Sequence, residues 1–363
     1  MLGHVRGLFF VDFPFIAKSP SLILRMLYAV TGFGHQAVVL FFVLSGYFIG
    51  TSVSEQVGAR RWSWRIYLVN RFTRLQLVLL PALLFGALWD QLGMRLPQAA
   101  SFYYGGLYKY YPPSVALRST VPVFLGNLFF LQSVIAPVFG SNGPLWSLSY
   151  EFWYYILFPV LILAATSWVG FRRRFLYLGL AFLLVWFIGR QISIYFLIWL
   201  MGVLIGRLRH ANWLHSTRAT AFVSLLAGVP FALALAWVRV HPQASETLSD
   251  LMIGGCFALW IYSLIQGTRM DVSVTYAKTS RTLAAFSYTL YLIHFPLLLL
   301  LRGLLDPYGN WQPDASHLFY GLAISLSVLS FAYLVAQFTE ARTAQVRRRV
   351  LSWSAPVVKE VVR

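Results

Sequence analysis

The sequence has little charge and a marked shortage of acidic residues. Only 11% of its 363 residues are charged, whereas a soluble domain carries about 25% charge, and 59% are hydrophobic. Asp and Glu together number 11, against 29 Lys and Arg. Such a composition excludes an ordinary soluble enzyme, because too few polar side chains remain to cover its surface. The lipid bilayer is therefore expected to be a main solvent and partner of this chain.

Several chemical motifs are also missing. A single cysteine, Cys256, excludes an intrachain disulfide. The sequence contains no glycine-rich phosphate loop, HExxH motif, nucleophile elbow or Cys/His cluster with metal-ligand spacing. These absences argue against an ATP-driven pump and a metalloenzyme, so we expect no bound metal or cofactor. No cleavable signal peptide, internal repeat or separate soluble domain is visible.

The net charge of +18 would suggest a nucleic-acid partner in a soluble chain. In a membrane protein, however, positive residues flank the spans and face the anionic cytoplasmic leaflet. We therefore expect no nucleic acid among the partners. The aromatic content of 17% fits belts of Trp and Tyr at the membrane interfaces.

Long apolar runs predict an all-α, polytopic integral membrane protein. A helical span needs about 20 mostly apolar residues, and the alternation typical of barrel strands is absent. The predicted crossings are 32–51, 75–92, 144–166, 175–189, 191–208, 219–238, 249–267, 283–301 and 316–338. A further apolar piece, 121–138, is shorter and interrupted by prolines, so we expect it not to cross.

Basic residues set the predicted orientation. Without a crossing at 121–138, 20 of the 29 Lys and Arg residues fall on one side, which is then cytoplasmic. A crossing there would give 21 against 8, but the first short basic loop, 60–65, would then oppose all the others. We therefore predict a membrane domain over residues 1–340 and a basic cytoplasmic tail over 341–363.

The first thirteen residues resemble the end of a span whose beginning is missing. On the count of basic residues, the next crossing runs from outside to inside, so a helix running outward is needed before it. We expect about ten transmembrane helices, with the first apparently truncated at its N-terminus.

Polar residues inside apolar helices are the candidates for function, because each costs free energy there unless it has a partner or a task. Glu151 lies near the outer end of an apolar helix and is either an interfacial or a site carboxylate. Asn142, Ser147 and Ser149 offer hydrogen-bonding groups within two turns of it. His4 is a candidate for proton transfer, because imidazole titrates near neutral pH, although a lone histidine at the chain start can equally have no function.

Two arginines and two further histidines each have a functional and a structural interpretation. Arg71 and Arg74 are three residues apart and share a helix face, where they can hold phosphates or anchor the helix at the cytoplasmic side. His294, with Tyr291 on the same face, can serve catalysis or helix packing. The same two possibilities apply to His35.

Four sequence blocks resemble, in order, the motifs of the bacterial membrane acyltransferase-3 family. The blocks are FFVLSGYFI at 41–49, RFTR at 71–74, WSLSYEFWY at 146–154 and SYTLYLIHFP at 287–296. Members of the family transfer acyl groups, commonly acetyl from acetyl-CoA, to hydroxyls of cell-surface polysaccharides, lipopolysaccharide and related acceptors. The resemblance implies a multi-pass protein of the bacterial inner membrane that uses acyl-CoA and a glycan or glycolipid acceptor. It leaves the oligomeric state open.

The resemblance also implies roles for individual residues. His4 matches the family's catalytic histidine and Glu151 the acid of its WSLSxE-type motif, while Arg71 and Arg74 match the RxxR pair at the acyl-CoA end. The chain departs from the family's pattern in two places. The arginine that precedes the family's histidine has no counterpart here, and His35-Gln36 replace the usual Val-Asp. The residues expected to line the substrate cavity are His35, Ser45, Asn142, Trp146, Ser149, Tyr291 and His294.

For an acyltransferase we expect direct transfer, with His4 taking the proton of the acceptor hydroxyl and Glu151 orienting His4. A relay through a Ser or Tyr is the alternative. Two other classes of protein stay open. A transporter or exporter of a glycan or small molecule would also contain buried charges, although no inverted repeat is detectable. A scaffold of a polysaccharide-assembly complex without activity is the third possibility.

Overall fold

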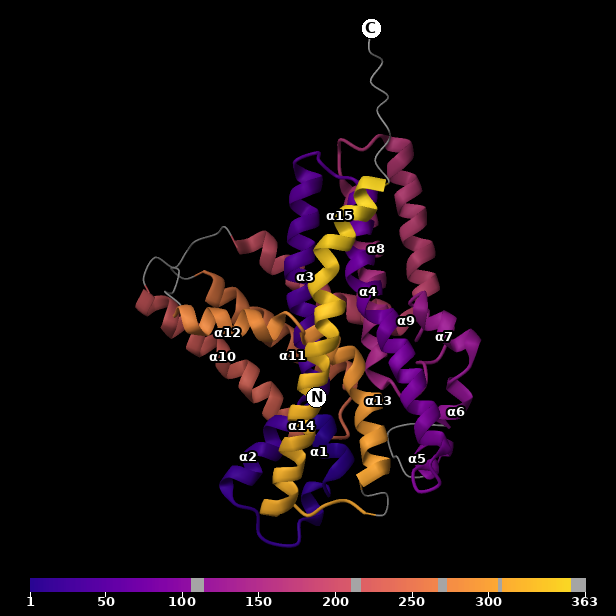
Figure 1. The fold of residues 1–363 in the computed structure, drawn as a ribbon. Helices are drawn as coiled ribbons and strands as arrows, with labels where there is room; N and C mark the ends of the chain where they lie inside the picture. Colours follow the sequence, from indigo (N-terminus) through magenta and orange to yellow (C-terminus); the bar gives the residue numbers. More distant parts are fainter. Residues whose placement is uncertain (106–113, 210–216, 267–272, 306–308, 354–363) are drawn as a thin grey trace. The chain divides into compact units, whose positions relative to one another are not determined.

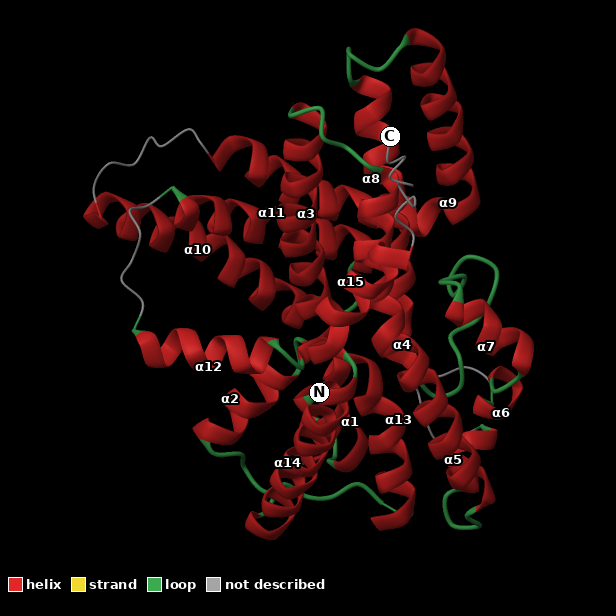
Figure 2. Ribbon diagram, turned by 45° about the horizontal axis from the view of Figure 1, so that its top comes forward, coloured by secondary structure: helices red, strands yellow, loops and turns green. Residues whose placement is uncertain are grey.

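The computed structural model describes residues 1–105, 114–209, 217–266, 273–305 and 309–353, most of which lie in helices. In this described part no strand is formed, and the β-type pairing that the structure shows consists of two isolated bridges, Phe10 with Trp311 and Gln132 with Ala136. Figure 2 shows helices connected by loops and turns. The predicted all-α membrane fold is therefore confirmed.

The chain divides into two compact units, each assembled from segments that are distant in sequence. The first unit contains Met1–Gly32, Ser63–Leu145 and Val274–Arg363, and the second contains Phe33–Trp62 and Trp146–Ser273. Neither unit is a continuous stretch of chain, so both depend on packing between helices that are far apart in sequence.

In the first unit, α13 is the central helix, because it packs against α4, α14 and α1. Figure 1 shows α14 and α13 close to α1. Its core includes the fully buried rings of Phe9, Tyr103 and Phe295. The elements of this unit are α1 (Leu2–Phe9), η1 (Phe13–Phe15), α2 (Leu22–Thr31), α4 (Trp64–Arg95), α5 (Ala100–Tyr104), α6 (Val115–Arg118), α7 (Val121–Leu128), η2 (Gly143–Leu145), α12 (Val274–Ala284), α13 (Ser287–Leu305), α14 (Ala315–Phe338), η4 (Glu340–Arg342) and α15 (Thr343–Trp353).

In the second unit, α9 packs along α3, α8 and α11, and α10 pairs with α11. Glycines allow α3 and α9 to approach closely. A Cβ at Gly46 would collide with the carbonyl oxygen of Trp199. Likewise, a Cβ at Gly202 would collide with that of Val43. Such small residues are typical of membrane helix interfaces. The helices of this unit are α3 (Gly34–Gly58), α8 (Trp146–Ala165), α9 (Phe171–Leu208), α10 (Thr217–Val240) and α11 (Glu246–Ile265).

Within the described residues, 8 helices are long and apolar enough to cross a bilayer. They include all of the predicted crossings, because α9 contains two of them, 175–189 and 191–208. The two halves of α9 meet at a kink at Gly189, whose φ of 76° lies in the left-handed region that glycine adopts readily. Large apolar side chains such as Phe182 and Leu225 are 73% and 70% exposed, as expected on lipid-facing surfaces.

The segment 121–138 contains only the eight-residue helix α7. A helix of that length is about 12 Å long, which is too short to span the hydrocarbon core, as predicted. The short helices α2 and α12 were not predicted. Helix α12 lies mostly between the predicted crossings 249–267 and 283–301.

The predicted tail, 341–363, is helical over part of its length. Helix α15 packs on α4, and Arg65 donates a hydrogen bond to the carbonyl oxygen of Leu351 at 3.3 Å. Residues 354–363 of the tail lie outside the described part of the chain. The domain boundary at residue 340 stays a prediction.

Candidate active site

Helices α1 and α13 of the first unit bring two of the predicted residues together, His4 and His294. Their ring centroids are 5.1 Å apart, with the ring planes tilted by 42°. The His4 ring also meets Phe295 edge-on at 5.0 Å. The packing follows from the sequence of α1, which buries Val5, Leu8 and Phe9. We call His4 and His294 the histidine pair.

The backbone of α13 fixes the tautomer of His294, which is 1% exposed. Its Nδ1 lies 2.9 Å from the carbonyl oxygen of Leu290 and 3.0 Å from that of Tyr291. Since a carbonyl only accepts hydrogen bonds, Nδ1 carries the proton and Nε2 is left as an acceptor. This Nε2 is buried and has no hydrogen-bond partner among the described residues. The histidine pair therefore presents an imidazole nitrogen whose lone pair is unused.

Two more of the predicted residues, Asn142 and Tyr291, join the segment before α8 to α13. Asn142 Nδ2 donates to the carbonyl oxygen of Leu292 at 2.7 Å, and the Tyr291 hydroxyl donates to that of Pro144 at 2.9 Å. The Tyr291 ring lies 6.3 Å from the His294 ring. In the described part of the chain, Oδ1 of Asn142 is buried without a hydrogen-bond partner. Four predicted site residues thus gather on α13 or against it.

Asp90 on α4 holds the same segment in place, and the sequence analysis did not single it out. Its carboxylate is 1% exposed and accepts hydrogen bonds from Ser141, from the backbone N at 2.8 Å and from Oγ at 2.6 Å. The neighbouring Gly140 has a φ of 54°, and a Cβ there would collide with this carboxylate. An acid near the end of a long apolar run was the signal that could have identified Asp90.

Arg71 and Arg74 both lie on α4, as predicted. Arg71 is half-buried, with its guanidinium carbon 5.5 Å from the centroid of the Tyr67 ring, in a cation–π contact. Arg74 is exposed. An apolar groove of about 600 Å³ follows the same stretch of α4 and reaches α15. Its lining residues are Leu68, Val69, Phe72, Thr73, Gln76, Leu77, Leu80, Pro81, Val346 and Val350.

The predicted acid Glu151 belongs to the second unit. It lies on α8, is 6% exposed and accepts a hydrogen bond from the Tyr155 hydroxyl one turn further along the helix. His4 belongs to the first unit, so the expected pairing of Glu151 with His4 stays a prediction.

Two other predicted residues of the second unit, Ser45 and Ser149, are buried and hydrogen-bonded. The Ser45 hydroxyl accepts from Trp199 Nε1 at 3.2 Å, which links α3 to α9. The Ser149 hydroxyl donates to the carbonyl oxygen of Trp146 within α8 at 3.1 Å. Both contacts stabilise helix packing or helix geometry, and a role in substrate binding stays a prediction for both serines.

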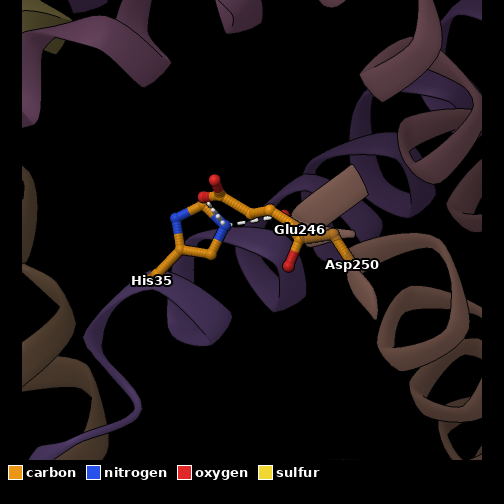
Figure 3. A group of neighbouring side chains, drawn as sticks. All are labelled: His35, Glu246 and Asp250. Atoms are coloured by element: carbon orange, nitrogen blue, oxygen red, sulfur yellow. Dashed lines mark hydrogen bonds and ion pairs between the residues drawn. The ribbon is translucent and has the colours of Figure 1, made fainter. Parts of the chain in front are cut away.

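His35 contacts two acids that the sequence analysis missed. Its Nε2 lies 2.6 Å from Asp250 Oδ2 and 3.3 Å from Glu246 Oε1 (Figure 3). The two acids are four residues apart on α11 and therefore share a helix face. The predicted cavity residue Trp146 stacks on the imidazole, with ring centroids 5.8 Å apart and planes 17° from parallel. His35 and Asp250 are 215 positions apart in the sequence, so no local motif could indicate their contact.

A family model described as an acyltransferase domain matches residues 1–336 of this chain. The chain belongs to the acyltransferase-3 family. The match contains all four sequence blocks and all the candidate residues named above. This acyltransferase-3 protein transfers acyl groups other than amino-acyl groups, and several of its helices are suited to cross a membrane. Comparisons with curated proteins and with solved structures found no match.

Proton transfer is the chemistry that the histidine pair of this acyltransferase can perform. A neutral imidazole nitrogen is a proton acceptor, and acyl transfer to a hydroxyl requires that the hydroxyl lose its proton. Of the predicted residues, His294 lies against the His4 ring, and Phe295, which was not predicted, packs beside it.

Proposed function

We propose that this protein moves an acyl group, acetyl in the simplest case, from acyl-CoA to a hydroxyl of a cell-surface glycan or glycolipid. The observation that carries the proposal is the acyltransferase match over residues 1–336. The acyl-CoA donor, the glycan acceptor and a location in a bacterial inner membrane are parts of the proposal.

Arg71 and Arg74 bind the phosphates of acyl-CoA in this proposal. Guanidinium groups form bidentate, charge-assisted hydrogen bonds with phosphate oxygens. The exposure of Arg74 and the half-burial of Arg71 leave both near the surface of α4. The apolar groove beside them, along 68–81, takes the uncharged arm of the donor, because its lining is almost entirely aliphatic and aromatic.

The histidine pair takes the proton from the acceptor hydroxyl. As the hydroxyl oxygen attacks the thioester carbonyl, the new C–O bond forms, the C–S bond breaks, and the proton passes to an imidazole and then to the thiolate of CoA. The unpartnered Nε2 of His294 supports this role, since it is a buried acceptor beside His4. Transfer is direct, without a covalent enzyme intermediate. Glu151 is the second proposed catalytic residue.

Release of CoA from acetyl-CoA by the detergent-purified chain, with glycans extracted from the cell envelope as acceptors, tests this function. His4→Ala is compared with a matched control, His241→Ala, because His241 is exposed and its ring contacts Trp237 one turn earlier. We expect His4→Ala to lower the rate by about 10²–10⁴-fold, the usual contribution of a general base, and His241→Ala to leave it unchanged.

The same assay separates the proposal from its main alternative. A transporter or exporter leaves the thioester intact with all three proteins. Cleavage of the thioester at an equal rate by the wild type and His4→Ala would support the acyltransferase activity but exclude His4 as its general base.

A further inference from the structure

We infer that the second unit contains a binding site for a divalent transition-metal ion, Zn²⁺ in the first place, formed by His35, Glu246 and Asp250. These three residues are the imidazole–carboxylate cluster of Figure 3. They come from the start of α3 and the first two turns of α11. The possible ligand atoms, one from each residue, all lie within 4.8 Å of one another. No step of the proposed function uses this site, so the two proposals can fail separately.

The distances in the imidazole–carboxylate cluster fit a cation after a small adjustment. Two ligand atoms that are each about 2.1 Å from a Zn²⁺ ion are roughly 3.0–3.4 Å apart at ordinary coordination angles. His35 Nε2 and Glu246 Oε1 already lie 3.3 Å apart. His35 Nε2 and Asp250 Oδ2, at 2.6 Å, need to separate by a few tenths of an ångström. The Glu246 side chain is 74% exposed and is therefore free to move towards a bound ion.

Second contacts hold two of the three ligands in position. The Tyr195 hydroxyl donates a hydrogen bond to Asp250 Oδ2 at 2.5 Å, and the Asp250 side chain is 1% exposed. Trp146 stacks on the imidazole of His35 and fixes the plane of the ring. Ligands in metal sites commonly have such outer partners, which orient them towards the ion.

The charge balance of the imidazole–carboxylate cluster also favours a cation. Among the described residues, no lysine or arginine lies within ion-pair distance of Glu246 or Asp250. A protonated His35 neutralises one carboxylate, whereas a divalent ion neutralises both. A buried carboxylate such as Asp250 is costly without compensation.

The donor set selects the class of metal. Imidazole nitrogen favours Zn²⁺ and its transition-metal neighbours over Mg²⁺ and Ca²⁺, which prefer sites made of oxygen alone. Three protein ligands leave a fourth position open, as in zinc sites that bind water or a substrate. The exposed side of Glu246 gives that position access from outside the protein, so a hydroxyl-bearing ligand could coordinate there.

Metal titration of the full-length protein in detergent tests the inference. The protein is stripped with a chelator, titrated with Co²⁺ while its visible absorption is recorded, and then titrated with Zn²⁺ in competition. We expect one ion per chain. Tyr195→Phe, which removes the outer hydrogen bond, should weaken binding by about 10–100-fold, and Glu246→Gln should weaken it further, because a ligand itself is changed.

A matched control is Glu55→Gln, which changes another exposed acid of the second unit. Glu55 pairs with Arg209 and belongs to the other end of α3, so its loss should leave Zn²⁺ affinity unchanged. Absence of stoichiometric Zn²⁺ binding by the wild type, or equal affinity in Glu55→Gln and Glu246→Gln, would overturn the site.

Thermal unfolding distinguishes a metal site from a purely structural ion pair. A ligand that binds only the folded state raises the Tm, so Zn²⁺ should stabilise the wild type but not His35→Ala or Asp250→Asn. If both variants have a lower Tm while Zn²⁺ leaves the Tm of the wild type unchanged, the cluster is an ion pair between helices and the inference is wrong.

Discussion

Each unit contains a histidine packed against aromatic rings, and the two histidines have opposite surroundings. In the first unit, His294 Nε2 is buried without a hydrogen-bond partner among the described residues, beside the ring of His4. In the second unit, His35 Nε2 faces two carboxylates. In these two sites the partners of an imidazole, more than its burial, determine its chemistry. A nitrogen without a partner suits proton transfer, whereas a nitrogen among acids suits the binding of a cation.

Disrupting the histidine pair should have the largest effect on activity. His4→Ala and His294→Gln should each lower the rate of CoA release by about 10²–10⁴-fold, because each removes a member of the proton-accepting pair. The double variant should be little worse than the poorer single variant, since residues that act as a unit give non-additive losses. The measurement is the initial rate for the four proteins. Multiplicative losses would show that the two rings act independently.

The donor end of the site is the next target. Replacing Arg71 or Arg74 by Ala should raise the KM for acyl-CoA, because each lost hydrogen bond between a guanidinium group and phosphate costs about 1.5–3 kcal/mol. That range corresponds to roughly 10–150-fold. Lys at either position should restore only part of the loss, since a point charge does not reproduce the bidentate geometry. An unchanged KM in the double Ala variant would reduce both arginines to anchors of α4.

Close packing of α3 on α9 offers a test of stability that does not involve either site. Gly46→Ala should destabilise the protein by about 1–3 kcal/mol, the usual cost of overpacking, because the new Cβ collides with the backbone of Trp199. Gly179→Ala on α9 is the matched control, since a Cβ there meets nothing within 4 Å. Thermal unfolding in detergent should show a lower Tm for Gly46→Ala alone. Equal Tm values for the two variants would mean that α3 and α9 can move apart to accommodate the new Cβ at little cost in stability.

The smallest effect on activity is expected from single cysteine substitutions that report the orientation of the chain in the membrane. In a chain carrying Cys256→Ser, a cysteine replacing Asn310 should react with an impermeant reagent added to intact cells. A cysteine replacing Ser352, in the basic stretch after the last span, should react only after permeabilisation. Activity should be unchanged by both substitutions. The reverse labelling pattern would invert the predicted orientation.

Much of the fold could be predicted from the sequence, because a single property, a run of about 20 apolar residues, identifies a membrane-spanning helix. The short helix α2 and the polar helix α12 could not, because neither has such a run. The apolar pattern placed two crossings within α9, but it does not encode the left-handed backbone of Gly189 that separates them.

The candidate site was predictable residue by residue but not as an arrangement. His4 and His294 were each identified, yet their proximity depends on the packing of α1 against α13. The sequence did not predict a role for Glu246 or Asp250, since acids near the start of a helix are common and favourable there. Their relation to His35 comes from the packing of α3 on α11, which joins segments more than 200 positions apart.

The most direct test of the account is whether the wild-type chain moves an acyl group to a hydroxyl. Purified protein is incubated with radiolabelled acetyl-CoA and glycans extracted from the cell envelope, and free CoA and alkali-labile acetyl ester are quantified together. The account predicts equal amounts of both products, and the loss of both with His4→Ala. An intact thioester in the presence of wild-type protein and glycan would contradict the account.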